Sequence, residues 1–124
     1  MRPAPFLTPI THFARRQNRE IIAVNQDPAG KQGILVDEYE SSYSKYRVWA
    51  RELHDGSYAI VLQNNHDMGT SVKVTFDAAM VGWESWAKFA ARDLYAHNDL
   101  GNHDGSITML VNPSDVEALV VKKL

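Results

Sequence analysis

Three aspartates close together in the sequence are the side chains that most suggest acid–base chemistry. Acid–base hydrolysis needs two carboxylates that converge across a pocket, roughly 5 to 9.5 Å apart according to the mechanism. Asp99 and Asp104 stand in a segment rich in asparagine and glycine, where a role in turns is favoured. Asp93 ends an apolar run, and we expect its carboxylate to accept hydrogen bonds from backbone amides.

The same segment, residues 97–105 (HNDLGNHDG), is rich enough in oxygen ligands to raise the question of calcium. If Gly105 took the glycine position of an EF-hand loop, Leu100 and Val111 would occupy the first and last ligand positions, and neither can bind a cation. A looser calcium site stays open. The histidines show no i, i+4 pair and no metal-ligand spacing, so surface or turn roles are favoured. They are His12, His54, His66, His97 and His103.

Three tryptophans offer a different chemistry, since aromatic faces can stack on sugar rings. Packing in a core or an interface is the favoured interpretation for Trp49, Trp83 and Trp86. Trp49 alternates with Val48 and so is a candidate for an outward-facing position. No serine stands in a Gly-x-Ser-x-Gly elbow, and no glycine-rich phosphate loop opens a helix. We therefore assign no catalytic, substrate-binding or metal-binding residue, and no cofactor.

The composition is that of one globular domain. Of the 124 residues, 44% are hydrophobic and 23% are charged, which allows a single core and argues against global disorder. A net charge of −2 offers no basic field for nucleic acid, and no apolar run is long enough to cross a membrane. The absence of cysteine excludes disulfides and thiol catalysis. Pro3, Pro5 and Pro9 interrupt any signal-peptide core, so no export signal is expected and the compartment stays open.

One short helix is expected before a series of strands. Asn18 is a suitable N-cap for a helix that runs through Glu20 and Val24. Pro28 and the glycines after it predict a connector over residues 27–33. From Ile34 onward the hydrophobic period changes to two.

Frequent turn signals then separate six predicted strands. These are residues 46–51, 57–62, 70–76, 86–94, 106–111 and 116–122. The tripeptide His54-Asp55-Gly56 predicts a hairpin between the first two. A short helical turn is expected over residues 77–82 and a polar loop over residues 97–105. This pattern indicates an all-β fold, an antiparallel β-sandwich of Greek-key type.

Two of these strands lack the alternation expected when one face meets water. Residues 58–62 and 118–121 are apolar at consecutive positions, so both of their faces need burial. The outer face either packs on another body or lies partly under loops, and both interpretations stay open. If the covering body is missing, we expect self-association through this face. Either Val61 or Leu119 lies on it, according to which of the two alternating sets of side chains points outward.

Three segments carry a family resemblance. Residues 18–33 (NREIIAVNQDPAGKQG) resemble the end of the catalytic barrel in the melibiase-type α-galactosidases, glycoside hydrolase family 27. Residues 48–51 (VWAR) and 53–59 (LHDGSYA) resemble the first hairpin of that family's C-terminal β-sandwich. Residues 91–101 (ARDLYAHNDLG) resemble a later segment of the same sandwich. The blocks occur in family order and cover about residues 18–124.

The resemblance implies a (β/α)8 barrel followed by an antiparallel sandwich, with two barrel aspartates as nucleophile and acid/base of a retaining mechanism. The Lys-Tyr-Asp and Arg-x-x-Asp-Asp motifs that carry those aspartates have no counterpart in this sequence, so no catalytic residue is transferred. Residues 1–33 are expected to hold an N-terminal extension, the terminal barrel helix and a connector, and residues 34–124 the sandwich. The sugar stays open among α-galactosides, α-N-acetylgalactosaminides and β-L-arabinopyranosides, because specificity resides in the barrel.

The expected function is therefore that of a non-catalytic sandwich that supports the barrel of an α-galactosidase-like enzyme, in cis or in trans. The alternative is a stand-alone carbohydrate-binding module that uses the tryptophans. Their positions discriminate between the two, because a coplanar exposed row favours sugar binding. Tryptophans on an apolar sheet face beside the N-terminal helix favour docking.

Overall fold

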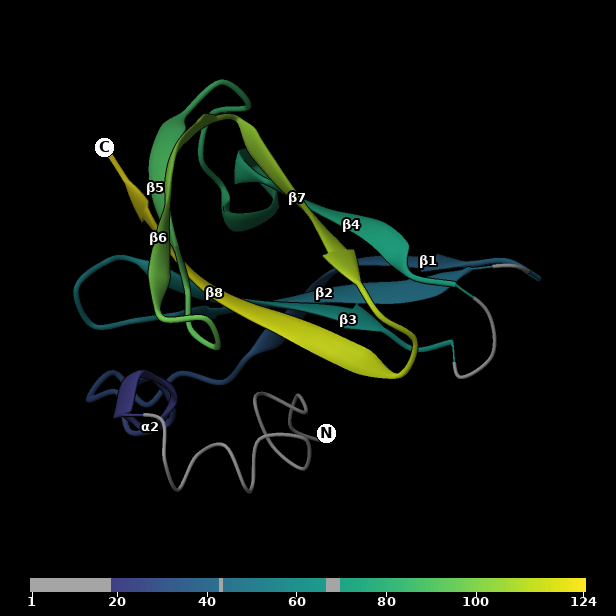
Figure 1. Cartoon of the computed structure of the whole chain (residues 1–124). Helices are drawn as coiled ribbons and strands as arrows, with labels where there is room; N and C mark the ends of the chain where they lie inside the picture. The colour runs from purple at the N-terminus through teal and green to yellow at the C-terminus, as the bar shows by residue number, and fades with distance from the viewer. Residues whose placement is uncertain (1–18, 43, 67–69) are drawn as a thin grey trace.

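The computed structural model describes residues 19–124 apart from 43 and 67–69, and it is an antiparallel β-sandwich with one short helix (Figure 1). Helix α2 spans Arg19–Asn25, and the 3-10 helix η2 spans Ala78–Val81. The strands are β1 (Ile34–Glu40), β2 (Lys45–Glu52), β3 (Tyr58–Asn64), β4 (Val72–Asp77), β5 (Lys88–Asp93), β6 (Asn98–Asp104), β7 (Ser106–Val111) and β8 (Asp115–Lys123).

The strands form two sheets. The larger has the order β1-β2-β3-β8-β5-β6, and the smaller pairs β4 with β7; every pairing is antiparallel. The C-terminal strand β8 lies between β3 and β5 and so joins the β1–β3 meander to the β5–β6 hairpin. In Figure 1, β4 and β7 lie over one face of the larger sheet, and α2 lies on the opposite side.

The main core fills the space between the two sheets. Val74 and Phe76 from β4 are fully buried, as are Ile60 and Leu62 from β3. The rings of Phe76 and Phe89 meet edge to face with their centroids 5.6 Å apart, which is a favoured aromatic geometry. The apolar side chains of β4 therefore face this core.

The register of β3 against β8 explains why both strands are apolar at consecutive positions. Ile60 pairs with Leu119, and both belong to the core between the sheets. Val61 pairs with Ala118, and both belong to a second cluster on the opposite face, which includes Val24 of α2. A helix and turn residues of this same chain cover part of that face, and packing on another body stays a prediction.

The six predicted strands and the helix are confirmed, with strand ends shifted by two residues or fewer. The helical turn expected over residues 77–82 is η2. The N-cap predicted at Asn18 lies outside the described residues. Strand β1, to which no strand had been assigned, pairs along the outer edge of β2.

The polar loop expected over residues 97–105 is wrong, because residues 98–104 form the edge strand β6. This strand pairs with β5, whose backbone supplies its hydrogen bonds, and its other edge is paired with no strand of the described residues. An edge strand with one exposed face tolerates polar residues, so the composition resembled that of a loop. Its inward side chains are few: Leu100 packs against the core, and His103 stacks on Phe89 with ring centroids 5.9 Å apart.

Gly105 carries the chain from the larger sheet into the smaller one. Its amide donates to the Ala87 carbonyl at 2.9 Å, and its carbonyl accepts from the Ala78 amide at 2.8 Å. The backbone has a φ of +80°, and a Cβ at this position would lie 2.4 Å from the Ser85 carbonyl oxygen. Glycine is therefore required at this corner for both conformation and space.

We predict that Gly105→Ala destabilises the sandwich more than Gly56→Ala does. Gly56 has a similar φ of +86°, but a Cβ there would meet no neighbouring atom within 4 Å, so its variant isolates the conformational cost, about 1–2 kcal/mol. The clash at Gly105 should lower the free energy of unfolding by about 1–3 kcal/mol more. Urea unfolding of both variants measures the difference. Equal losses would show that the Ser85 carbonyl moves aside freely.

Candidate functional site

The candidate site is the face of the larger sheet that turns away from β4 and β7. We call it the outer face and define it by Ala59, Val61, Val116, Ala118 and Val120. Val24 of α2 and Leu94 of the β5–β6 turn belong to the same buried cluster. Val61 is only 3% exposed, so the open sheet face expected from the sequence is covered at this position within the chain.

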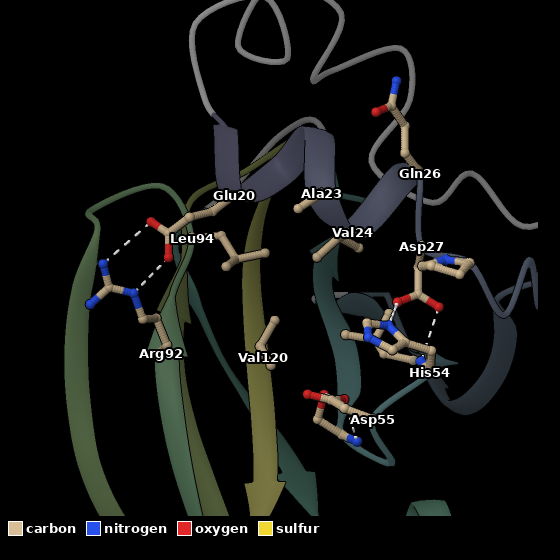
Figure 2. Close-up of a pocket in the computed structure, with 13 residues that line it drawn as sticks. Glu20, Ala23, Val24, Gln26, Asp27, His54, Asp55, Arg92, Leu94 and Val120 are labelled. Carbon is tan, nitrogen blue, oxygen red and sulfur yellow. Dashed lines mark hydrogen bonds and ion pairs between the residues drawn. The ribbon is translucent and has the colours of Figure 1, made fainter.

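A groove of about 540 Å³ remains between α2 and this face (Figure 2). Its middle is apolar, with Ala23 and Val24 on the helix side and Val120 on the sheet side. Glu20 and Arg92 lie at one end, and Asp27 and His54 lie at the other. The groove thus combines an apolar floor with a carboxylate and a basic partner at each end.

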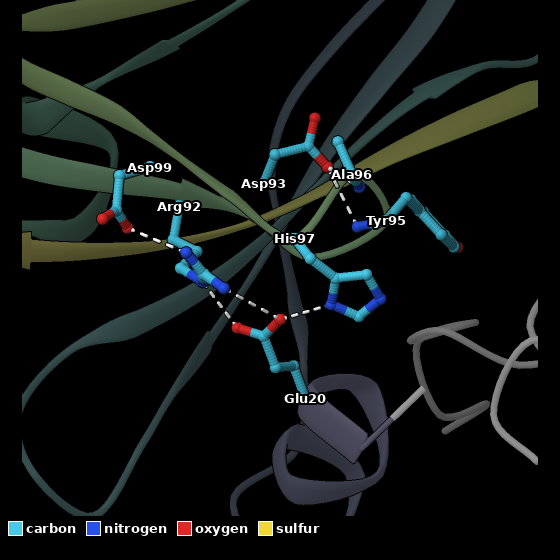
Figure 3. A network of polar contacts seen from close by, with 7 residues as sticks. All are labelled: Glu20, Arg92, Asp93, Tyr95, Ala96, His97 and Asp99. Atoms are coloured by element: carbon cyan, nitrogen blue, oxygen red, sulfur yellow. Dashed lines mark hydrogen bonds and ion pairs between the residues drawn. The ribbon is translucent and has the colours of Figure 1, made fainter. Parts of the chain in front are cut away.

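At the first end, Glu20 of α2 binds two basic side chains of the sheet (Figure 3). Its carboxylate accepts from Arg92 Nε at 2.6 Å and lies 2.5 Å from His97 Nδ1. Arg92 also donates from Nη1 to Asp99 at 3.1 Å, so its guanidinium joins α2 to β6. The hydrogen bonds from Arg92 and then His97 hold the pKa of Glu20 below its usual value, against the effect of burial.

At the second end, the chain leaving α2 is tied to the β2–β3 turn through Asp27. Its side chain is 5% exposed and accepts from the amides of Ala29 and His54, both at 3.0 Å. The same carboxylate lies 2.6 Å from His54 Nδ1. Burial alone would raise the pKa of Asp27, but the His54 and Ala29 hydrogen bonds lower it below its usual value. The bond to Asp27 raises the pKa of His54.

The aspartates singled out for acid–base chemistry have different partners. Asp93 Oδ1 accepts from the amides of Tyr95 and Ala96 at 2.9 and 3.0 Å, which confirms the expected backbone role (Figure 3). This bonding shapes the turn that presents Leu94 and His97 to α2. Asp99 pairs with Arg92, and Asp104 is exposed opposite Lys88 in β6. The turn roles expected for Asp99 and Asp104 are wrong, since both stand in that strand.

Glu117 is an unusual carboxyl that no sequence pattern indicated. Burial first, then the nearby charges of Asp93 and Asp115, raise its pKa to about 7. Tyr95 lies in the same region, where burial and the same acidic neighbours raise its pKa to about 12. Within the described residues, no group of three or more acidic or histidine side chains has an arrangement that could hold a metal ion.

Of the described histidines, three lie at the interface or beside the core, and His66 follows β3, where its amide donates to Asn64 Oδ1 at 3.0 Å. His54 and His97 take the two ends of the groove, and His103 Nε2 lies 2.9 Å from the Leu100 carbonyl oxygen. His12 lies outside the described residues. In the part of the chain that the structure describes, no helix is both long and apolar enough to cross a bilayer.

The three tryptophans lie in three different environments and do not form a row. Trp49 packs against the outer-face cluster, and its Nε1 donates to Gln63 at 3.1 Å. Trp83 packs against the core between the sheets and meets Tyr58 edge to face. Trp86 is 75% exposed in the turn before β5. The criterion derived from the sequence therefore favours docking, with Trp49 on the sheet face beside the helix.

Comparison with known proteins gives a family match over most of the sandwich. The model of the alpha galactosidase C-terminal beta sandwich domain matches residues 43–121, more than half of the chain. The chain belongs to this family. The α-galactosidase of Coffea arabica is 34% identical over 109 residues, which make up 88% of this chain and 27% of that protein.

Solved structures share the fold of this α-galactosidase sandwich. Alpha-galactosidase I from Mortierella vinacea superposes with a TM-score of 0.71 and 24% identity, over 84% of this chain and 26% of that one. A β-L-arabinopyranosidase from Geobacillus stearothermophilus gives a TM-score of 0.70 and 20% identity, over 86% and 22% of the two chains. The chain spans about a quarter of the length of the curated relatives that it matches.

The segments that carry the family resemblance meet at the helix–sheet interface of this sandwich. Residues 18–33 supply Glu20 and Asp27, residues 53–59 supply His54, and residues 91–101 supply Arg92 and His97. Glu20 and Arg92 are 72 positions apart in the sequence. Sequence reasoning missed their pairing because no local pattern links residues so far apart, although both stand in family segments.

We predict opposite behaviours for two polar substitutions on the central strands. Val61→Thr places a hydroxyl under α2 and should lower the free energy of unfolding by about 1–2 kcal/mol while loosening the helix. Leu119→Lys buries an ammonium between the sheets, where Leu119 is fully buried, and should abolish folding.

Circular dichroism and hydrogen exchange of residues 19–25 measure both effects. Val120→Thr is the matched control, because its half-buried position in the groove lets the hydroxyl reach water. A folded Leu119→Lys protein would show that the assignment of strand faces is wrong.

Proposed function

We propose that this chain is the non-catalytic sandwich of an enzyme that hydrolyses terminal α-galactosides, and that its outer face and α2 support the catalytic barrel. The observation that carries this proposal is the seating of α2 on the outer face. That helix lies in the segment that resembles the last part of the family's barrel. A barrel that ends in α2 would therefore adjoin the outer face of the sheet.

The polar contacts at both ends of α2 support the same proposal. A helix of seven residues has little stability of its own, so tertiary contacts must fix it. The Glu20–Arg92 pair and the Asp27–His54 pair hold its two ends on different strands or turns of the sheet. A barrel continuous with α2 would thereby be held at a defined orientation, and its remaining apolar side chains would fill the groove.

We place the boundary between the two parts at residues 33 and 34, where β1 begins. Residues 1–33 would then belong to the barrel side as an extension, terminal helix and connector, and residues 34–124 to the sandwich. The substrate would be an α-galactoside, as the names of the α-galactosidases of Coffea arabica and Mortierella vinacea suggest for those proteins. Catalysis would reside in the barrel, which is why no residue of this chain receives a catalytic role.

A chimaera tests the supporting role. We predict that the Coffea arabica α-galactosidase, with its sandwich from the terminal helix onward replaced by residues 19–124, hydrolyses an aryl α-galactoside, whereas the isolated chain does not. The same chimaera with Arg92→Ala should melt at a lower temperature, because the variant breaks the Glu20 contact. Lys88→Ala, on the exposed start of β5, is the matched control.

Two results would contradict the proposal. The first is turnover by the homogeneous isolated chain that is lost when a single aspartate is substituted. The second is retention of the isolated chain on a galactomannan column, if the substitution Trp86→Ala abolishes that retention. This result would support the stand-alone carbohydrate-binding module.

We also propose that, without a barrel, copies of this chain associate through the groove. Helix α2 covers part of the face that was predicted to drive association, and the apolar groove beside it is left for a second copy. A net charge of −2 opposes such association only weakly. Light scattering should show a mass that rises with concentration and that falls in Ala23→Lys, whose new charge lies on the exposed helix side of the groove. A monodisperse monomer at high concentration would contradict this.

A further inference from the structure

Both ends of the α2 segment are attached to the sheet through a carboxylate and a histidine. At the N-terminal end Glu20 lies 2.5 Å from His97 Nδ1, and at the C-terminal end Asp27 lies 2.6 Å from His54 Nδ1. His97 stands in the β5–β6 turn and His54 in the β2–β3 turn, so the two histidines reach α2 from separate parts of the larger sheet.

The exposure of the His54 ring lets it respond to the pH of the solvent while the carboxylates of Asp27 and Glu20 stay ionised. The side chain of His54 is 60% exposed, so its ring exchanges protons with water. Asp27 accepts two backbone amides besides the imidazole, and Glu20 accepts the Arg92 guanidinium. These donors stabilise the ionised carboxylates whatever the charge on the histidines.

We propose that His54 and Asp27 form a pH-sensitive latch, which holds the C-terminal end of the α2 segment on the outer face when His54 is protonated and loosens it when His54 is neutral. The pair changes from an ion pair to a neutral hydrogen bond when the imidazole loses its proton, and charge-assisted bonds are about twice as strong. The latch concerns residues 19–124 by themselves and does not rest on the proposed docking of a barrel.

The direction of the pH dependence follows from the shifts at each group. The pKa of His54 is raised above 6.5, so its contribution is complete below that value and is lost as the pH rises through the folded-state pKa. The pKa values of Glu20 and Asp27 are lowered from 4.5 and 3.8, so their contributions are lost only as the pH falls below those values. The latch is therefore strongest at about pH 5–6.5.

Among the described residues, the other charged groups around the latch are Asp55 with Lys122 beside it, Arg92, Asp99 and Glu117. Asp55 lies near His54 and favours its protonated form, and its own pKa is lowered first by the Ser57 hydroxyl. Arg92 stays protonated between Glu20 and Asp99. Glu117 differs, since its raised pKa of about 7 also makes global stability fall as the pH rises from 4.5 to 7. A test of the latch must therefore remove Glu117 and measure α2 locally.

Hydrogen exchange of the α2 amides in a Glu117→Gln background provides that test. After correction for the intrinsic rate, we expect the protection of residues 19–25 to fall severalfold between pH 5.5 and 8, while the amides of β3 keep theirs. For each unit by which folding raises the pKa of the histidine, the protection of the α2 amides can change at most tenfold. The variant His54→Gln keeps a neutral donor at this position and should abolish the difference between the two pH values.

A matched control uses an ion pair of the same chain that does not titrate in this range. Lys31→Gln removes the Lys31–Glu52 pair and should leave the pH dependence of α2 protection intact. An NMR titration of His54 gives a second readout, because Asp27→Asn should lower the pKa of the ring toward its ordinary value. If the His54→Gln variant keeps the full pH dependence, or if His54 titrates identically in the Asp27→Asn protein, the latch is wrong.

Discussion

The pairing of β3 with β8 is the constraint on which the rest of the molecule depends. These central strands are apolar on both faces, and their register places Ile60 and Leu119 on one side and Val61 and Ala118 on the other. Exposed apolar surface costs about 25 cal/mol per Å², so both faces must be covered. Strands β4 and β7 cover the inner face, and α2 covers part of the outer one. A two-layer sandwich thereby acquires a third, partial layer.

That third layer is held differently from the other two. The two sheets are joined by interdigitated apolar side chains such as Phe76 and Phe89, which need no charged partners. Helix α2 is short, and Val24 is the side chain that it is seen to place in the outer-face cluster among the residues whose burial is described. The carboxylates of Glu20 and Asp27 supply the remaining contacts. Because they are ionic and partly exposed, these contacts depend on pH and are weaker than a core.

Local patterns predicted the fold to a large extent. Alternation with a period of two located six strands, and His54-Asp55-Gly56 located the hairpin between β2 and β3, because these signals depend on neighbouring residues. Strand β6 was missed for a physical reason. Its polar residues lie on an edge, where backbone pairing with β5 rather than side-chain burial defines the strand. Glu117 was missed because its raised pKa results from burial and from Asp93 and Asp115, whose approach depends on the packing of the turns.

The sequence by itself determined the family, the positions of the six strands that it predicted and the need of two strands for cover on both faces. Each of these is encoded in short segments, and residues 18–33, 53–59 and 91–101 are enough to identify the family. Only the tertiary structure decided that those segments meet at one interface and that α2 provides the cover. It also assigned Glu20 to Arg92 and His97, and Asp27 to His54. Such partners are 27 to 77 positions apart, and long-range pairing arises from the packing of the sheet rather than from any local preference of the chain.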